Sequence, residues 1–132
     1  MLTERPFVVR WGDRPLDMTS IVGKFRRSAF NAIYTDPEHG VAVGHWEVEH
    51  GYEDYGDFPQ AEIFYIVEGT ATVQTEEGDI PVGPGDVVLM LPGRHARFVV
   101  TDPVKVFYVT SGAQDIEGMQ EARRQAAGQK GR

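Results

Sequence analysis

The chain has 132 residues, 20 of them acidic and 13 basic, and a formal net charge of −7. That length fits one domain with its own hydrophobic core, and the negative charge repels a phosphate backbone, so nucleic acid is not an expected partner. The absence of cysteine excludes disulfides and cysteine-ligated zinc, which leaves His, Asp, Glu and Tyr as candidate ligands or catalysts.

The start of the chain and its longest apolar run both argue against a membrane protein. "MLTERPFVVR" places an acidic residue and a proline where a signal peptide needs an apolar run, and "VVLML" at 87–91 is too short to span a bilayer. We therefore expect a soluble, cytoplasmic protein with no membrane partner.

Residues 1–40 are the least regular part of the sequence. "PFVVRW" at 6–11 is compatible with an edge strand, and "GKFRRSAFNAIY" at 23–34 with another strand or a short helical turn. We expect this part to pair with, or pad, the main body of the domain.

Residues 41–110 form a series of short β-type runs separated by turn residues. Glycine and proline punctuate them, and many short strands of this kind predict a sandwich or closed barrel rather than alternating strands and helices. The predicted strands are "VAVGHWEVE" (41–49), "EIFYIVEG" (62–69), "TATVQTE" (70–76), "DIPVG" (79–83), "DVVLML" (86–91), "ARFVVT" (96–101) and "VKVFYVT" (104–110).

The last residues, 111–132, are predicted to form a short helix and a frayed tail. Asp115 is a plausible N-cap, and Ile116, Met119 and Ala126 lie near helical spacing. The sequence therefore predicts a single all-β domain over 1–132, with a barrel core at 41–110 and a C-terminal helix.

The centre of the chain resembles the cupin superfamily. "EIFYIVEG" matches the E-x6-G end of the first cupin motif, from Glu62 to Gly69, and "GDVVLMLPG" matches the glycines of the second motif, from Gly85 to Gly93. "HWEVEHG" and "VTDPVKVFYVT" look most like the branch of ureidoglycine aminohydrolase-like and ethanolamine-utilisation-like cupins. The resemblance implies a double-stranded β-helix, or jelly-roll barrel, over about residues 41–110.

The metal ligands of the cupin motifs are mostly replaced in this chain. By position, the two histidines of the first motif fall on Tyr55 and Asp57, and the histidine of the second falls on Ala96, with His95 one residue early. Only Glu62 remains. We therefore expect no metal cofactor; the alternative is one divalent ion such as Mn, Fe, Ni or Zn on non-standard ligands.

Glu62 is the candidate catalytic residue, because the resemblance directs it into the barrel mouth together with Phe64. Tyr55 and Asp57 lie two apart, so in an extended segment they share one face and offer hydrogen bonds to a polar ligand. The alternative is that "YEDYGD" is a solvated acidic loop.

Four further residues are candidate ligand contacts. Trp46 is predicted to face inward as core or pocket wall, with His45 facing the other way, towards a neighbouring sheet or a partner subunit. His95 and Arg97 follow the second-motif turn, where an arginine can bind a carboxylate or phosphate. Lys105 shares a face with Phe107 and Val109, so it is either a pocket lysine or a solvent-exposed one.

Three hypotheses for the function remain open from the sequence. One is a metal-independent or unusually liganded acid–base enzyme acting on a small polar metabolite, of the isomerase, lyase or hydrolase type. The second is a non-catalytic small-molecule binding or sensor module, and the third is a barrel filled by its own aromatic side chains that acts in a complex through its surface. The resemblance also implies a homodimer that pairs through a sheet edge or an exchanged N-terminal strand.

Overall fold

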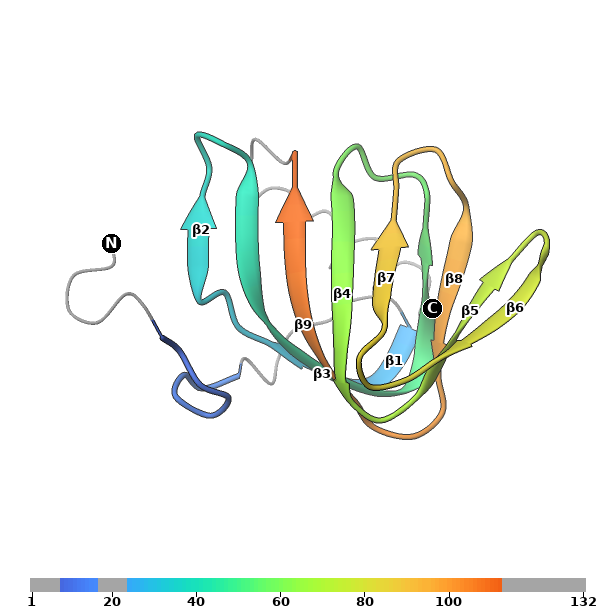
Figure 1. The fold of residues 1–132 in the computed structure, drawn as a ribbon, viewed down its shortest axis with the longest axis horizontal. Coiled ribbons are helices and arrows are strands. Elements are labelled where there is room, and N and C mark those ends of the chain that lie inside the picture. The colour runs from blue at the N-terminus through green and yellow to red at the C-terminus, as the bar shows by residue number, and fades with distance from the viewer. Residues whose placement is uncertain (1–7, 17–23, 113–132) are drawn as a thin grey trace.

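In the computed structural model, residues 8–16 and 24–112 are described, and the regular elements among them are all strands (Figure 1). No helix in these residues is long and apolar enough to cross a membrane. The strands are β1 (Lys24–Phe30), β2 (Tyr34–Asp36), β3 (Val41–Tyr55), β4 (Ala61–Glu68), β5 (Ala71–Thr75), β6 (Gly78–Val82), β7 (Val87–Met90), β8 (Ala96–Val100) and β9 (Val104–Ser111).

The strands form one antiparallel sheet that curls into a nearly closed barrel (Figure 1). Its strand order is β6-β5-β8-β3-β9-β4-β7, and β1 and β2 both pair with β3. β3 therefore pairs with four strands: its first half contacts β9 and β2, its second half contacts β8, and β1 runs beside its middle. The barrel stays open between its two edge strands, β6 and β7.

The predicted all-β fold is confirmed, and each run expected between residues 41 and 110 contains a strand. Among the described residues of the segment expected at 23–34, residues 24–30 form β1 and Tyr34 begins β2. The proposed edge strand "PFVVRW" is wrong for residues 8–11, which contain no strand and lead into a turn closed by the Asp13 amide on the Arg10 carbonyl. The predicted C-terminal helix lies outside the described residues.

β3 runs six residues further than the sequence pattern indicated, because it continues through an irregularity at His50 and Gly51. His50 has a φ of 52°, a value unusual for a residue with a side chain. Before it the buried positions are even-numbered, as at Trp46 and Val48, and after it they are odd-numbered, as at Glu53 and Tyr55. His50 therefore marks the point in β3 after which odd-numbered rather than even-numbered residues face inward.

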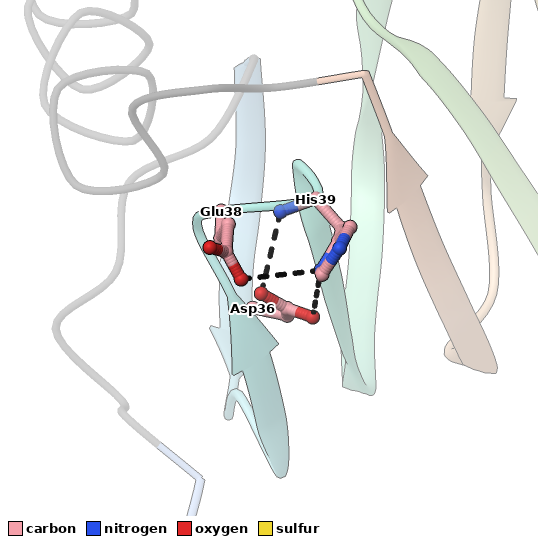
Figure 2. A group of neighbouring side chains, drawn as sticks. All are labelled: Asp36, Glu38 and His39. Atoms are coloured by element: carbon pink, nitrogen blue, oxygen red, sulfur yellow. Dashed lines mark hydrogen bonds and ion pairs between the residues drawn. The ribbon is translucent and has the colours of Figure 1, made fainter.

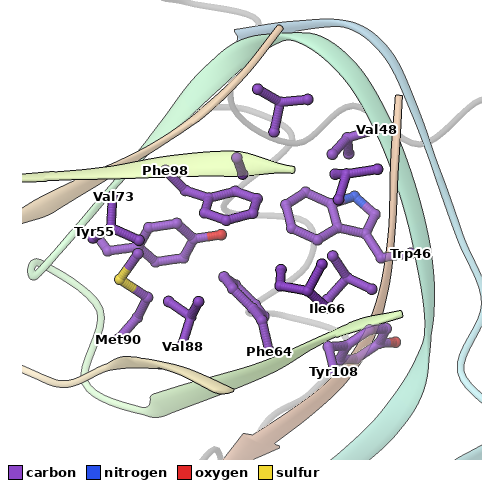
Figure 3. Close-up of a cluster of buried hydrophobic side chains, with 14 residues drawn as sticks. Trp46, Val48, Tyr55, Phe64, Ile66, Val73, Val88, Met90, Phe98 and Tyr108 are labelled. Carbon is purple, nitrogen blue, oxygen red and sulfur yellow. The ribbon is translucent and has the colours of Figure 1, made fainter. Parts of the chain in front are cut away.

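The barrel is filled by aromatic and branched side chains from facing strands (Figure 3). Trp46 lies at its centre, with ring centroids 5.4 Å from Phe64 and 6.0 Å from Phe98, and its indole N–H donates to Ser28 Oγ at 2.9 Å. The inward orientation predicted for Trp46 is thus confirmed. Burial of such rings stabilises the fold by their large apolar area and their tilted ring contacts.

The outer face of β3 is covered by the described part of the N-terminal segment. Trp11 stacks on His45 with ring centroids 4.2 Å apart, and its indole N–H donates to Glu47 Oε2 at 3.0 Å. His45 faces outward as predicted, but the chain's own Trp11 covers it. Burial lowers the pKa of His45, and the nearby carboxylates of Asp13 and Glu47 oppose this shift.

Gly44 is required by close approach of the backbone. A Cβ at this position would lie 1.9 Å from the Asn31 carbonyl oxygen and 2.7 Å from Tyr108 Oη, which donates to that same oxygen.

We predict that Gly44→Ala lowers the free energy of unfolding by about 1–3 kcal/mol, as measured by urea denaturation. Gly83→Ala is the control, because a Cβ there would meet Thr70 only at 3.6 Å. Equal stability of the two variants would contradict this reading.

The buried His45 predicts a stability that falls on mild acidification. Its pKa is lower in the folded state than the usual 6.5, so the unfolded chain binds the proton more readily. Stability from this group is complete above pH 6.5 and is lost as the pH falls towards the lower folded pKa. We expect His45→Phe, which keeps a ring against Trp11, to reduce the drop in melting temperature between about pH 7.5 and about pH 5.5. An unchanged pH dependence would show that His45 does not cause it.

Candidate functional site

One end of the barrel interior is polar. Glu53 and Tyr55 on β3 and Glu62 on β4 are each 3–4% exposed, and Thr110 on β9 is 2% exposed. Gln60, one residue before β4, is 3% exposed and continues the inward alternation of Glu62 and the residues after it. Polar groups are rarely buried without a structural or functional role, because their desolvation costs free energy.

Glu62 is placed by its strand partners. In the register of the sheet it lies opposite Thr110 of β9 on one side and Met90 of β7 on the other, and all three side chains are buried. Phe64, two residues on, is 1% exposed and packs against Tyr55 with ring centroids 5.6 Å apart. The predicted inward orientation of Glu62 and Phe64 is therefore confirmed, whereas the catalytic role of Glu62 stays a prediction.

Glu53 and Tyr55 form a hydrogen-bonded pair inside the barrel. Tyr55 Oη donates to Glu53 Oε1, and Figure 3 shows the Tyr55 hydroxyl directed into the aromatic interior. Glu53 lies opposite Phe98 in the register of β3 and β8, so its carboxylate is surrounded by the core rather than by solvent. Glu53 could not be identified from the sequence. At His50 the inward-facing residues of β3 change from even-numbered to odd-numbered positions, and the hydrophobic pattern of "EHGYEDY" gives no sign of this change.

A cleft of about 400 Å³ opens between the β5–β6 hairpin and β7. Val73, Val88 and Met90, all members of the core, form part of its wall, and its rim carries Arg94 and His95. Met90, which lines it, is the strand partner of Glu62, and Ala96, which also lines it, is the strand partner of Tyr55. The cleft therefore adjoins the polar end of the interior, and its volume is that of a small-molecule site.

A second, shallower depression of about 480 Å³ lies on the other side of His95. Four of the candidate ligand contacts line it: Tyr55, Asp57, His95 and Arg97. Asp57 and His95 are largely exposed, with Asp57 Oδ1 3.8 Å from His95 Nε2. The expectation that Tyr55 and Asp57 share one face is wrong, because the chain leaves β3 at Gly56, whose φ of 121° ends the strand alternation.

Arg97 and Lys105 both lie on the outer surface of the barrel. Arg97 Nε donates to Asp54 Oδ1 at 2.7 Å, and its guanidinium lies 4.0 Å above the Tyr52 ring. The hydrogen bond to Asp54 raises the pKa of Arg97 further. Lys105 shares its face with Phe107 and Val109 as predicted, and this face is the outer one.

Lys105 is partly exposed, and its ammonium lies 3.8 Å from Glu68 and 5.7 Å from the centre of the Trp11 ring. Neither cation therefore faces the barrel interior. Among the residues that the structure describes, no lysine or arginine is buried.

The interior residues do not fit a cupin metal centre. Of the candidate donors, Tyr55 and Glu62 are buried inside the barrel, whereas Asp57 and His95 lie at its exposed rim. Within the described ranges, the group of three carboxylate and histidine side chains close enough to share an ion lies elsewhere. No step that depends on a metal follows from this arrangement.

That group, Asp36, Glu38 and His39, belongs to the turn between β2 and β3 (Figure 2). His39 Nδ1 lies 2.7 Å from Asp36 Oδ2, and the His39 amide donates to Asp36 Oδ1 at 3.3 Å. The hydrogen bond from His39 holds the pKa of Asp36 below its usual range. These contacts are those of an aspartate closing an exposed turn.

Comparison with known families decides the classification. The AraC-like ligand binding domain profile matches residues 38–132. The chain belongs to this family. The match includes β3 to β9, the strands that enclose the polar interior and the cleft. No curated protein sequence matches the chain significantly.

Solved structures of the same fold confirm a cupin barrel. The EutQ protein of Clostridium difficile superposes with a TM-score of 0.67 at 17% identity, over 82% of this chain and 88% of its own. The polyketide cyclase RemF of Streptomyces resistomycificus gives 0.65 at 15% identity, over 83% and 80%. The Cnp3 cupin domain of Schizosaccharomyces pombe gives 0.63 at 12% identity, over 88% and 80%. At these identities the likeness shows the fold alone.

The pair of Glu53 and Tyr55 makes a prediction for stability. Tyr55→Phe keeps the ring against Phe64 and removes a donor to a buried carboxylate, so we expect the free energy of unfolding at neutral pH to fall by about 1–3 kcal/mol. Urea denaturation measures this. Tyr65→Phe, on the exposed face of β4, serves as the control with little expected change. Equal stabilities would mean that the Tyr55 hydroxyl makes no net contribution.

Proposed function

We propose that this cupin domain binds a small polar metabolite at the polar end of its barrel, in contact with Glu62. The observation that carries the proposal is the burial of Glu53, Gln60 and Glu62 on the inward face of a barrel whose core is mainly aromatic and branched aliphatic. A barrel filled only for stability needs no carboxylate there, because apolar residues of similar volume are less costly to bury.

The adjoining cleft supports the same proposal. It has the volume of a small-molecule site, an apolar wall and a polar rim, and it is bordered by the strand partners of Glu62 and Tyr55. Membership of a family of ligand binding domains is in line with such a use of the barrel. In this proposal the apolar wall of the cleft holds the body of the ligand, and the interior carboxylates fix its polar groups.

Acid–base chemistry at Glu62 is the second candidate function. It is favoured by a carboxylate with 3% exposure on the ligand-facing side, since removal from water is one way in which a carboxyl group becomes suited to proton transfer near neutral pH. In this version Glu62 moves a proton on a carbonyl-bearing substrate, without a metal.

The homodimer and the cytoplasmic location stay predictions from the sequence.

The proposal predicts that Glu62→Gln weakens ligand binding. A thermal-shift screen of polar metabolites on the wild-type domain identifies a ligand, since a bound ligand raises the melting temperature by mass action. We expect calorimetry with that ligand to show a loss of about tenfold or more in affinity for Glu62→Gln. Glu68→Gln, at the exposed end of the same strand, should bind as the wild type does.

Two results would count against this proposal. The first is a screen in which no polar metabolite shifts the wild-type melting temperature and Glu62→Gln cannot be distinguished from wild type. The second is stoichiometric Mn, Fe, Ni or Zn in the purified protein that is lost in Glu62→Ala. This result would show that the site holds a metal ion.

A further inference from the structure

Gln60 is a buried amide whose nitrogen has no hydrogen-bond acceptor. Its side chain is 3% exposed, and Nε2 has no partner among the described residues. A buried donor in this state costs folding free energy, and it is rare in native structures. No residue that the structure describes supplies the acceptor, which leaves a ligand bound at this position as one source of it.

The position of Gln60 places that acceptor at the polar end of the barrel. It comes directly before β4 and continues the inward face of Glu62, Phe64 and Ile66. A side chain two residues before Glu62 that keeps this alternation lies on the same face of the sheet as Glu62. Across the sheet, Ala61 pairs with Ser111, and Gly112 lies close to the Gln60 backbone.

We propose that Gln60 Nε2 donates a hydrogen bond to a carbonyl or amide oxygen of an uncharged ligand, which Glu62 contacts at a donor group. This rests on the proposed function and names its ligand class. The interior supplies two carboxylates, Glu53 and Glu62, and no buried lysine or arginine among the described residues. An anionic acceptor would add negative charge to a desolvated site without a countercharge, which favours a neutral carbonyl.

The experiment uses nuclear magnetic resonance on the full-length, ¹⁵N-labelled protein. The side-chain amide peaks of Gln60 are assigned by their loss in Gln60→Met. Three probes are titrated: N-methylacetamide, a neutral acceptor that also carries a donor; acetate, an anionic acceptor; and methylammonium, a donor only. We expect N-methylacetamide to shift the Gln60 peaks saturably, and acetate to bind at least about tenfold more weakly. Methylammonium should leave these peaks in place.

The Gln60→Met variant separates a ligand contact from a structural role. Replacing an unpaired buried amide by an apolar side chain of similar length should raise the melting temperature of the free protein by about 2–4 °C. The same variant should bind N-methylacetamide, and any metabolite found by the screen, about tenfold more weakly. The control is Gln74→Met, because Gln74 is exposed on β5 and should change neither property.

Each contrary outcome is decisive. If acetate binds more tightly than N-methylacetamide, or if no acceptor shifts the Gln60 peaks, the ligand class proposed here is wrong. If Gln60→Met lowers the melting temperature, the amide has a structural role. If a metabolite depends on Glu62 but binds Gln60→Met normally, the role of Gln60 fails while the proposed function stands. A wild-type protein that binds no probe and no metabolite overturns both.

Discussion

The arrangement of the whole barrel depends on strand β3, which pairs with four other strands. In the middle of this strand the residues that face the barrel interior change from even-numbered to odd-numbered positions. Its hydrogen bonds to β1, β2, β8 and β9 make it the common neighbour of both halves of the sheet. At Gly51 the Lys24 carbonyl approaches so closely that a Cβ would lie 1.9 Å from it. A strand without the irregularity at His50 and Gly51 would direct Glu53 and Tyr55 outward, and the interior would lose two of the five residues of its polar end.

The polar end and the apolar core are parts of one continuous interior, so under the proposed function stability and ligand binding are coupled in it. Trp46, Phe64 and Phe98 supply the apolar contacts, and Tyr55 links them to the buried carboxylate of Glu53. Burial of acidic groups lowers the stability that an all-apolar core of this size would reach. Natural proteins commonly accept such a loss at binding sites.

The sequence was sufficient to predict the architecture but not the full composition of the site. Period-two runs and glycine turns predict the strands, because strands depend on local alternation. The inward direction of Glu62 was implied correctly by the resemblance of residues 62–69 to the first cupin motif. Glu53 and Gln60 could not be found in this way. Glu53 follows the change at His50 from even-numbered to odd-numbered inward-facing residues, and Gln60 precedes the strand in what the pattern indicates as a loop. Similarly, no local signal shows that Trp11 covers His45, because that contact joins distant parts of the chain.

The open seam between β6 and β7 also sets a limit on what the domain can admit. β7 is tied to the far side of the cleft at both ends: to β6 through the turn at 83–86, where the Gly83 amide donates to Asp86 Oδ2, and to β8 through residues 91–95. The cleft is thus bounded by covalent connections at both ends of β7, and on its far side by β6, β5 and β8, which are joined by strand pairing. Under the proposed function, the length of the two connections limits how far β7 can move away from β6, and so the cross-section of a ligand that can enter. We therefore expect a longer connection at either end to widen the range of ligands that the cleft admits.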